Sequence, residues 1–306
     1  MKPLLLAAGA ASLVLCAAGA EATPTLVLKN LRAEVEIVPE ARPDISVVVE
    51  ANGSSDPPPV VSAAGDRVTV EGNIPTGRQG YRVSLNLDRR MDVVEMKRRS
   101  HLARVQRPDL MRIVVHAPMK FKVKSNAYVF GHIGPSETLG VSDNGDGEWR
   151  IDPVSGDFSM EGDGGTDFHV ATSRTASVGL LGTGNVTLGD TQSLYSGQFG
   201  SGDLVASRVS LKSDISISGV GDFEAKYVSG AMDILITDAG SARIEDGDAA
   251  KLKVRTIDGL GSVVFGGTVK DADINIGTAA KVRIHKVTGT LAKTTRQQAT
   301  VDIDTP

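Results

Sequence analysis

The sequence predicts an all-β protein, namely a single right-handed parallel β-helix (a β-solenoid) with an N-terminal β cap. Three observations predict this fold. A Gly-x-Gly turn recurs about every 19 residues, two apolar residues follow each turn, and the composition combines 34 glycines with 4% aromatic residues and no helical periodicity. A repeat of this length is typical of a solenoid, in which each coil buries its apolar side chains against its neighbours.

The turn repeat is visible in six units along the chain. Their turns are Gly145-Asp146-Gly147, Gly182-Thr183-Gly184, Gly200-Ser201-Gly202, Gly219-Val220-Gly221, Asp238-Ala239-Gly240 and Gly259-Leu260-Gly261. Glycine at a corner permits a positive φ, which other residues adopt only at a steric cost. The residue that follows is polar, as in Asn185, Asp203 and Asp222. Because such side chains bond nearby backbone groups, stacked copies predict a polar ladder along one edge.

Apolar residues form two ladders after the turns. The first inward position runs through Trp149, Phe168, Val186, Leu204, Phe223, Ala242, Val263, Val282 and Val301, and the second runs through Ile151, Val170, Leu188, Ala206, Ala225, Ile244, Phe265, Ile284 and Ile303. The two positions lie two residues apart, which is the period of a strand, so both side chains point to the same face. Trp149 is expected to fill the first large coil, and a sugar-stacking position on the outside is the alternative.

Two weaker ladders indicate further strands in each coil. One runs through Met160, Leu180, Phe199, Ile217, Ile236, Ile257 and Ile276, and the other through Val209, Val228, Ala249, Val269 and Val287. Two or three short parallel strands per coil describe a parallel β-helix, and at ~4.8 Å per coil nine coils span roughly 40 Å. The variable coil length and the crossover rule favour the right-handed form.

The N-terminus reads as a Sec signal peptide over residues 1–22. Lys2 supplies the charged start, Leu4 to Ala18 supply the apolar core, and two small-x-small cleavage sites end at Ala20 and Ala22. This apolar run is short for a permanent membrane span. Cys16 is the only cysteine and lacks the small preceding residue of a lipoprotein, so cleavage is expected to leave a mature chain without disulfides. The expected location is the periplasm, the outer-membrane surface or the extracellular medium of a bacterium.

The chain before the coils is predicted to be a cap. The expected divisions are 1–22 for the signal peptide, 23–124 for N-terminal strands, cap and a basic insertion (78–106), and 125–306 for the β-helix coils. Alternation predicts strands over 25–28, 33–37, 44–50 and 66–71, with a break at Pro57-Pro58-Pro59. These strands are expected to cover the end of the β-helix, which is otherwise a bare pairing edge. At the other end, Leu291 to Pro306 either complete the last coil or pair with another copy.

Several segments together resemble a known bacterial family. They are Leu31 to Pro39 (LRAEVEIVP), Ile45 to Val49 (ISVVV), Val114 to Pro118 (VVHAP) and repeats such as Ser218 to Phe223 (SGVGDF). The chain resembles the autotransporter adhesin head domain family, also called the GIN domain, a domain of unknown function. The resemblance covers nearly all of the mature chain and implies a right-handed β-helix exported to the cell envelope, with no established catalytic residues. The long basic stretch between Arg78 and Gln106 departs from the family.

Charge is segregated along the chain, although the formal net charge is only −4. Residues 1–77 carry a net charge of −4, residues 78–124 carry +9 and residues 125–306 carry −9. The candidate polyanion-binding residues are Arg89, Arg90, Lys97, Arg98, Arg99, Arg104 and Arg107. Arginine pairs well with phosphate and carboxylate, which favours lipopolysaccharide, acidic glycan or anionic lipid as a ligand. A solvated insertion and self-association with the acidic coils are alternatives, and the expected export argues against nucleic acid.

Catalysis, metals and cofactors are not predicted. The densest carboxylates are Asp143, Asp146, Glu148, Asp152, Asp157, Glu161, Asp163 and Asp167, and their spacing spreads them around successive coils. A glycine-aspartate calcium coil would repeat, and the stretch Asp163 to Phe168 does not. The histidines are His101, His116, His132, His169 and His285, without zinc-site spacing, and His169 is expected to point outward.

The function predicted from these features is binding rather than catalysis. We expect a non-enzymatic, exported cell-envelope β-solenoid, adhesin-like, that presents a surface to glycan, lipopolysaccharide or another cell-surface partner. One alternative is a polysaccharide-active lyase or glycosidase, since such chemistry also needs carboxylates grouped on one outer face. The other is a purely structural envelope protein without a soluble ligand.

Overall fold

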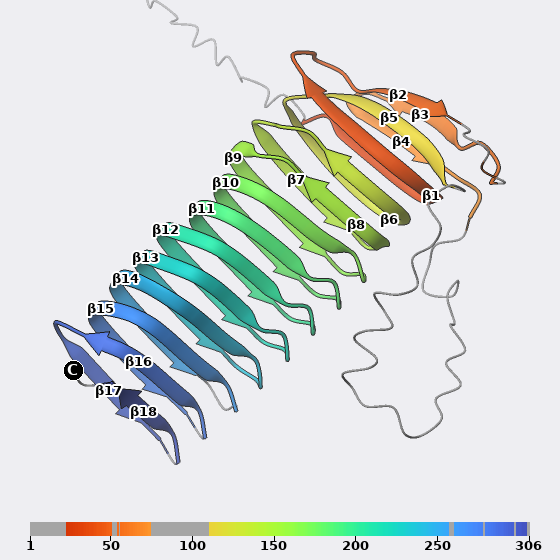
Figure 1. Cartoon of the computed structure of the whole chain (residues 1–306). Coiled ribbons are helices and arrows are strands. Elements are labelled where there is room, and N and C mark those ends of the chain that lie inside the picture. Colours follow the sequence, from red (N-terminus) through yellow and green to blue (C-terminus); the bar gives the residue numbers. More distant parts are fainter. Residues whose placement is uncertain are drawn as a thin grey trace, which may run out of the picture.

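The computed structural model describes residues 23–50, 54, 56–74, 110–256, 260–277, 279–296 and 298–304. This part of the chain is all-β and contains no helix, and its parallel strands stack into a β-solenoid of about nine turns with coils of about 19 residues (Figure 1). The predicted fold class is therefore confirmed. Within the same residues there is no helix that could span a membrane.

The described residues form eighteen strands, in chain order. They are β1 (Thr25–Glu40), β2 (Ser46–Glu50), β3 (Val60–Ala64), β4 (Arg67–Glu71), β5 (Met111–Pro118), β6 (Lys120–Ile133), β7 (Thr138–Asp143), β8 (Asp146–Ile151), β9 (Val154–Gly162), β10 (Asp167–Leu180), β11 (Val186–Gln198), β12 (Leu204–Ile217), β13 (Phe223–Ile236), β14 (Ser241–Thr256), β15 (Ser262–Ile276), β16 (Lys281–Val287), β17 (Leu291–Thr295) and β18 (Thr300–Ile303).

Each coil from β10 to β14 consists of one long bent strand and one tight turn. The first half of β10 pairs with β8 and its second half pairs with β9, so the strand passes over both faces of the solenoid. We call the face of the first halves face A and the face of the second halves face B. The bend between the halves is the corner edge, and the glycine-containing turns between strands form the turn edge.

The two ladders of face A are confirmed at every step. Trp149 pairs with Phe168, and the register continues through Val186, Leu204, Phe223, Ala242, Val263, Val282 and Val301. The second ladder keeps the same register from Ile151 to Ile303. Trp149 is fully buried, so its predicted core position is correct and the alternative outside position is wrong.

The third predicted ladder is wrong in register in its first steps on face B, and its step from Ile217 to Ile236 is correct. Val178, not Leu180, pairs with Met160, and Leu180 pairs with Gln198 rather than Phe199. Gln198 is buried and Phe199 is 60% exposed. The prediction placed Phe199 inward because it is apolar. The period of two along the strand decides which side chain points inward, and it selects Gln198. Ile257 of this ladder lies outside the described residues.

The fourth predicted ladder is correct except at one step. Val209 pairs with Val228, and Ala249 pairs with Val269. Val228 itself pairs with Gly247, however, and Gly230 pairs with Ala249 before the register shifts. Gly230 has a φ of 80°, so it is the place where the strand absorbs the irregularity.

The turn glycines are needed for a different reason from the one predicted. Among the described turn glycines of the solenoid only Gly147 has a positive φ. A Cβ on Gly182 would lie 2.1 Å from the carbonyl oxygen of Gly164, and one on Gly200 would lie 2.1 Å from that of Gly182. The stacked turns approach each other so closely that a side chain at these positions would collide with the backbone of the preceding coil.

The predicted polar ladder is present on the turn edge. The backbone N–H groups of Asn185 and Asp203 donate to side-chain oxygens of Asp167 and Asn185, at 2.9 and 3.0 Å. The same contact continues through Asp222 to Ser241 at 3.0 Å. Each of these side chains accepts a hydrogen bond from a backbone N–H of the next coil and not from its own turn. The ladder therefore holds successive coils in register.

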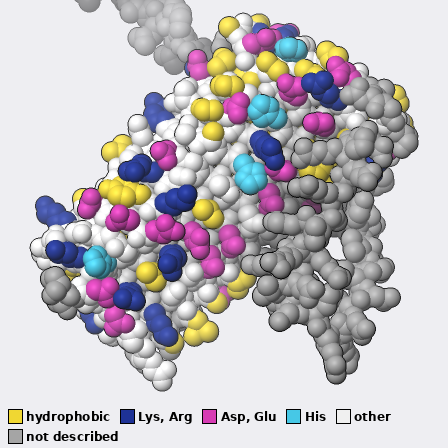
Figure 2. All heavy atoms as spheres, viewed as in Figure 1, with side chains coloured by type: hydrophobic (Ala, Val, Ile, Leu, Met, Phe, Trp, Pro, Cys, Tyr) yellow, Lys and Arg dark blue, Asp and Glu magenta, His cyan; other side chains and the backbone are white. Residues whose placement is uncertain are grey.

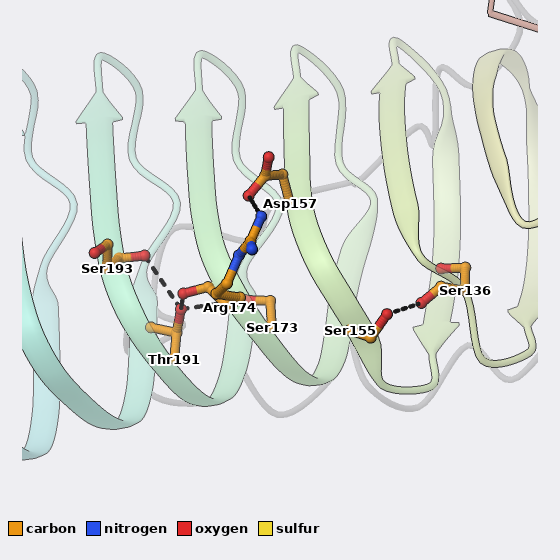
Figure 3. A network of polar contacts seen from close by, with 7 residues as sticks. All are labelled: Ser136, Ser155, Asp157, Ser173, Arg174, Thr191 and Ser193. Atoms are coloured by element: carbon orange, nitrogen blue, oxygen red, sulfur yellow. Dashed lines mark hydrogen bonds and ion pairs between the residues drawn. The ribbon is translucent and has the colours of Figure 1, made fainter.

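Hydroxyl groups fill part of the corner edge (Figure 3). The buried Ser173 donates to Thr191 Oγ1 at 3.2 Å, and this hydroxyl lies 3.1 Å from the carbonyl of Ser193. In the next two coils Val209 and Val228 occupy the position of Thr191. The corner therefore changes from hydrogen-bonded to aliphatic along the solenoid.

The N-terminal end is covered by antiparallel strands. On one side β1 pairs in parallel with β6, and on the other side it pairs in parallel with β4 and β5. The strands β3 and β2 then pair antiparallel with β4 and β5. The boundary expected between residues 124 and 125 falls inside β6, so the parallel stack extends through this point.

The C-terminal end is a coil of short strands. The strands β17 and β18 stack on β15 and β16, and Val301 and Ile303 complete the face A ladders. Lys293 pairs with the core residue Ile274, which is an inward position, and its ammonium group lies 3.4 Å from the carbonyl oxygen of Val301. A charged side chain across the open end hinders pairing with another strand edge.

Candidate functional site

The strand β11 reverses the usual distribution of polar and apolar side chains. In its second half Ser196 and Gln198 are buried in the core. Tyr195 and Phe199, which alternate with them, are 39% and 60% exposed. Apolar side chains are normally inside and amides outside, and departures from such local rules are expected at functional sites. This segment is therefore the starting point for the candidate site.

The inward side of this segment is incompletely hydrogen-bonded. Gln198 Nε2 donates to the carbonyl of Asp222 at 3.2 Å, but Gln198 Oε1 has no partner among the described residues. The hydroxyls of Ser196 and Ser213 also lack one there. An unsatisfied buried polar group costs about 1–3 kcal/mol. Apolar side chains at these positions would not carry this cost, which directs attention to the outer side of the segment.

The outer side of the segment forms the floor of a groove of about 680 Å³ on face B. The lining comes from six successive strands, β9 to β14, so the groove runs along the solenoid axis for about 24 Å at ~4.8 Å per strand. Small residues, among them Gly179 and Gly197, leave it hollow. The ring of Phe199 lies so close to Gly197 that a Cβ there would be 3.0 Å from it.

One half of the groove is aromatic and the other half is charged. Tyr195 pairs in register with Asp214, and Asp214 pairs with Asp233 on the next strand. Lys212 contacts Asp214 at 2.8 Å and lies 5.1 Å from the centre of the Tyr195 ring. Its hydrogen bond with Asp214 raises the pKa of Lys212. Asp233 contacts Arg255 at 2.9 Å.

A second hollow, of about 650 Å³, lies on face A near the N-terminal end. Its charges are mutually paired: Arg112 contacts Glu36 at 2.5 Å, and Arg150 contacts Glu148 at 2.7 Å. Basic and acidic side chains are likewise intermixed over the face seen in Figure 2. Most of the groove's charges are also paired, but this hollow offers less apolar surface and lacks the exposed rings of Tyr195 and Phe199, so the groove is the better candidate.

The basic residues predicted to bind polyanions lie outside the described residues. These are Arg89, Arg90, Lys97, Arg98, Arg99, Arg104 and Arg107, within the undescribed range 75–109. Their role therefore stays a prediction.

The acidic run singled out in the sequence is dispersed. Asp157 contacts Arg174 at the corner edge, Glu148 lies on face A, Glu161 lines the groove on face B, and Asp143 is inside the core. Each described histidine stands near a carboxylate: the distances are 3.3 Å for His116 and Glu40, 3.3 Å for His132 and Asp152, 3.8 Å for His169 and Glu148, and 3.6 Å for His285 and Asp304. His169 is exposed, as expected. In the described part of the chain no three such residues are grouped so that they could hold a metal ion.

Asp143 is a buried carboxyl group that holds the first turn. It accepts hydrogen bonds from the Gly145 N–H at 2.6 Å and from the indole N–H of Trp149 at 2.7 Å. Burial raises the pKa of Asp143 to about 6, although these two hydrogen bonds act in the opposite direction. The group is fully buried inside the core, on the strand next to β9, and serves to position the turn and the indole.

Sequence reasoning missed the groove because it assigned Phe199 to the core. The signal was nevertheless present, since Tyr195 and Gly197 lie two residues apart on β11 and Phe199 continues the same alternation directly after the strand ends. Comparisons with protein-family models, with curated proteins and with solved structures give no match for this chain. The site is therefore interpreted from its own geometry.

Proposed function

We propose that the protein is an exported, non-enzymatic binding module of the bacterial cell envelope, adhesin-like, that holds an extended glycan chain in the groove of face B. The observation that carries the proposal is the combination of exposed aromatic rings and charged groups in one groove that follows the solenoid axis. The signal peptide and the resemblance to the GIN domain family, both predicted from the sequence, support the export and adhesin parts.

A glycan fits the chemistry of the groove. Sugar rings have apolar faces and hydroxylated edges, and recognition sites for such ligands combine apolar and aromatic surface with a few polar groups. Tyr195 and Phe199 offer ring surface to the sugar faces. The carboxylates of Asp214 and Asp233 can accept hydrogen bonds from sugar hydroxyl groups, and the guanidinium group of Arg255 can donate to them. The length of about 24 Å suits a polymer rather than a compact metabolite.

The test is retention of the purified chain on a panel of neutral, amino and acidic oligosaccharides, with the masses of the sugars read afterwards. We expect Tyr195→Ala to weaken the affinity for the retained glycan about tenfold, which corresponds to ~1.4 kcal/mol. Leu211→Ala is the matched control, because Leu211 is 60% exposed and does not line the groove. Retention that is equal in both variants contradicts a role for the groove.

A polysaccharide-active enzyme is the second candidate, and the groove gives it a location. Asp214 and Asp233 occupy matching positions on neighbouring strands, which places two carboxylates on one outer face. If the unmodified chain produces new fragment masses and the Asp214→Asn and Asp233→Asn variants do not, the enzyme proposal is supported and the binding proposal is contradicted. Intact sugars in the eluate favour binding alone.

The basic insertion is a separate hypothesis, for anionic lipid, lipopolysaccharide or acidic glycan. Reversal of Arg89, Arg90, Lys97, Arg98 and Arg99 to Glu is expected to abolish salt-sensitive retention on anionic vesicles. Unchanged retention contradicts this hypothesis and leaves the groove proposal as it stands. Absence of retention on both sugars and vesicles favours a purely structural envelope protein.

A further inference from the structure

One row of paired residues runs along the whole floor of the groove, and we call it the floor row. Its members are Glu161, Gly179, Gly197, Ser216, Leu235 and Arg255, one from each strand from β9 to β14. All of them line the groove. At ~4.8 Å per strand the first and last positions are about 24 Å apart. The groove therefore has a carboxylate at its β9 end and a guanidinium group at its β14 end.

The two ends of the floor row differ in what their charges already contact. Arg255 donates two hydrogen bonds to Asp233, at 3.2 and 2.9 Å. Further along the groove, Lys212 at the rim contacts Asp214 at 2.8 Å. Glu161 is exposed, and within the described part of the chain no ion pair joins it to another residue. Its carboxylate is therefore the charge of the groove lining that is left for a ligand.

The floor beside Glu161 is kept open by a glycine that the backbone does not require. A Cβ on Gly179 would lie 3.6 Å from its nearest neighbour, the carbonyl oxygen of Met160, which is an ordinary contact. A Cβ on the turn glycines Gly182 and Gly200 would instead collide with the preceding coil. The Cβ on Gly179 would also lie 3.9 Å from Cγ of Glu161. Glycine at this position therefore leaves room for a ligand next to the free carboxylate.

The cation that fits this room is an ammonium group. The chain itself shows how the groove holds one: the Lys212 ammonium contacts the carboxylate of Asp214 at 2.8 Å and lies 5.1 Å from the centre of the Tyr195 ring. A cation near an aromatic ring is attracted by the ring electrons. A metal ion fits less well, because it needs several ligands and no group of three possible ligands occurs among the described residues.

We propose that the glycan bound in the groove carries free amino groups and that Glu161 pairs with one of them; this inference rests on the glycan-binding function proposed above. The protonated amine donates to the Glu161 carboxylate, and the sugar ring lies over Gly179 and Gly197, beside the ring of Tyr195. A hydrogen bond between two charged groups is about twice as strong as a neutral one. N-acetylation removes the positive charge, so an acetylated chain keeps the ring contacts and loses this pair.

The charge of the whole groove favours a cationic glycan over an acidic one. Its lining contains three carboxylates, those of Glu161, Asp214 and Asp233, and the guanidinium group of Arg255. With the ammonium of Lys212 at the rim included, the carboxylates still outnumber the cations by one. An acidic glycan would have to displace Asp233 from Arg255 and would meet the uncompensated Glu161. Like charges brought together in this way disfavour binding.

The experiment compares two oligosaccharides of equal length, a chitosan oligomer with free amines and its fully N-acetylated form. Calorimetric titration at a mildly acidic pH, at which the amines are protonated, gives both dissociation constants. We expect the unmodified chain to bind the free-amine oligomer about tenfold more tightly. Glu161→Gln keeps the size of the side chain and removes its charge. This variant is expected to lower the preference below about threefold and to leave the affinity for the acetylated oligomer unchanged.

Two controls separate amine recognition from general attraction to the acidic coils. Glu224→Gln is the matched variant, because Glu224 is exposed on face A and does not line the groove. An equal loss of preference in Glu161→Gln and Glu224→Gln overturns the proposal. A lysine oligomer carries the same charges without sugar rings, and it overturns the proposal if it binds as tightly as the chitosan oligomer.

The outcomes also distinguish this inference from the proposed function. Equal affinities for the two oligomers, or a preference for the acetylated one or for an acidic oligosaccharide, overturn the pairing with Glu161. If Tyr195→Ala weakens binding in those cases, the glycan-binding function stands. Absence of binding to every sugar overturns both. Gly179→Ala, which the backbone accommodates, is expected to weaken binding of both oligomers severalfold, and unchanged affinity in this variant overturns the placement of the sugar beside Glu161.

Discussion

The second halves of β11 and β13 stack in the same parallel solenoid and have opposite chemistry. The second half of β13 buries Ile234 and Ile236, whereas the equivalent half of β11 buries Ser196 and Gln198. Both strands nevertheless keep parallel register with their neighbours. The difference teaches that the neighbouring coils impose the conformation of an individual coil, so that its outward side chains are free to be selected for binding.

The largest expected effect comes from giving β13 the inward chemistry of β11. Ile236 is fully buried and stacks directly on Ile217. Ile236→Gln removes apolar contacts and buries an amide without a partner, so we expect a loss of about 4 kcal/mol in the free energy of unfolding. Urea denaturation measures it. A loss below ~1 kcal/mol would mean that the core tolerates polar groups at any coil, and β11 would then be unexceptional.

Asp143 tests whether a buried polar group that can titrate behaves differently from Gln198. Its pKa is raised to about 6 in the folded protein from 3.8, so the folded state binds the proton more tightly than the unfolded state. This group's contribution to stability is therefore fully present below about pH 4 and is lost as the pH rises to about 6. The expected change is on the order of 3 kcal/mol.

The measurement is denaturation followed by the fluorescence of Trp149, the only tryptophan, which Asp143 contacts directly. Asp143→Asn is the comparison variant and should flatten the pH dependence between pH 4 and 6. An equal slope in both proteins would contradict the role of Asp143. Asp304 cannot cause such a loss, because its pKa is lowered, chiefly by its hydrogen bond with Arg283, and its contribution to stability increases as the pH rises.

Gln198→Leu makes the reverse change and should stabilise the protein. The substitution removes the unsatisfied Oε1, and the carbonyl of Asp222 keeps the hydrogen bond from the Leu204 N–H at 2.9 Å. We expect a gain of about 1–2 kcal/mol in the free energy of unfolding, with unchanged glycan retention. Destabilisation instead would indicate that a buried water or an undescribed partner satisfies the amide.

The same contrast explains how much of the molecule could be predicted from its sequence. The face A ladders were correct at every step because apolarity and the strand period agree from Trp149 to Ile303. On face B apolarity and the strand period conflict at Phe199, and the prediction placed this residue inward because it is apolar. The groove was missed for that reason, since it exists only if Phe199 and Tyr195 point outward. The requirement for glycine at Gly200 was predicted, but its cause depends on the spacing between coils, which a single turn does not reveal.

The smallest expected effect on stability, and the sharpest test of the outer surface, is Gly197→Ala. A Cβ at Gly197 would meet only the ring of Phe199, at 3.0 Å, and an exposed ring can move aside. At Gly200 the same Cβ would meet a backbone carbonyl at 2.1 Å, which cannot move without shifting the preceding coil. We therefore expect Gly197→Ala to change the free energy of unfolding by less than about 0.5 kcal/mol, and Gly200→Ala to destabilise the fold by several times as much. Because the new methyl group fills the floor of the groove and displaces the ring, Gly197→Ala should still weaken glycan retention severalfold. Unchanged retention in a stably folded Gly197→Ala protein would place the ligand elsewhere on the solenoid.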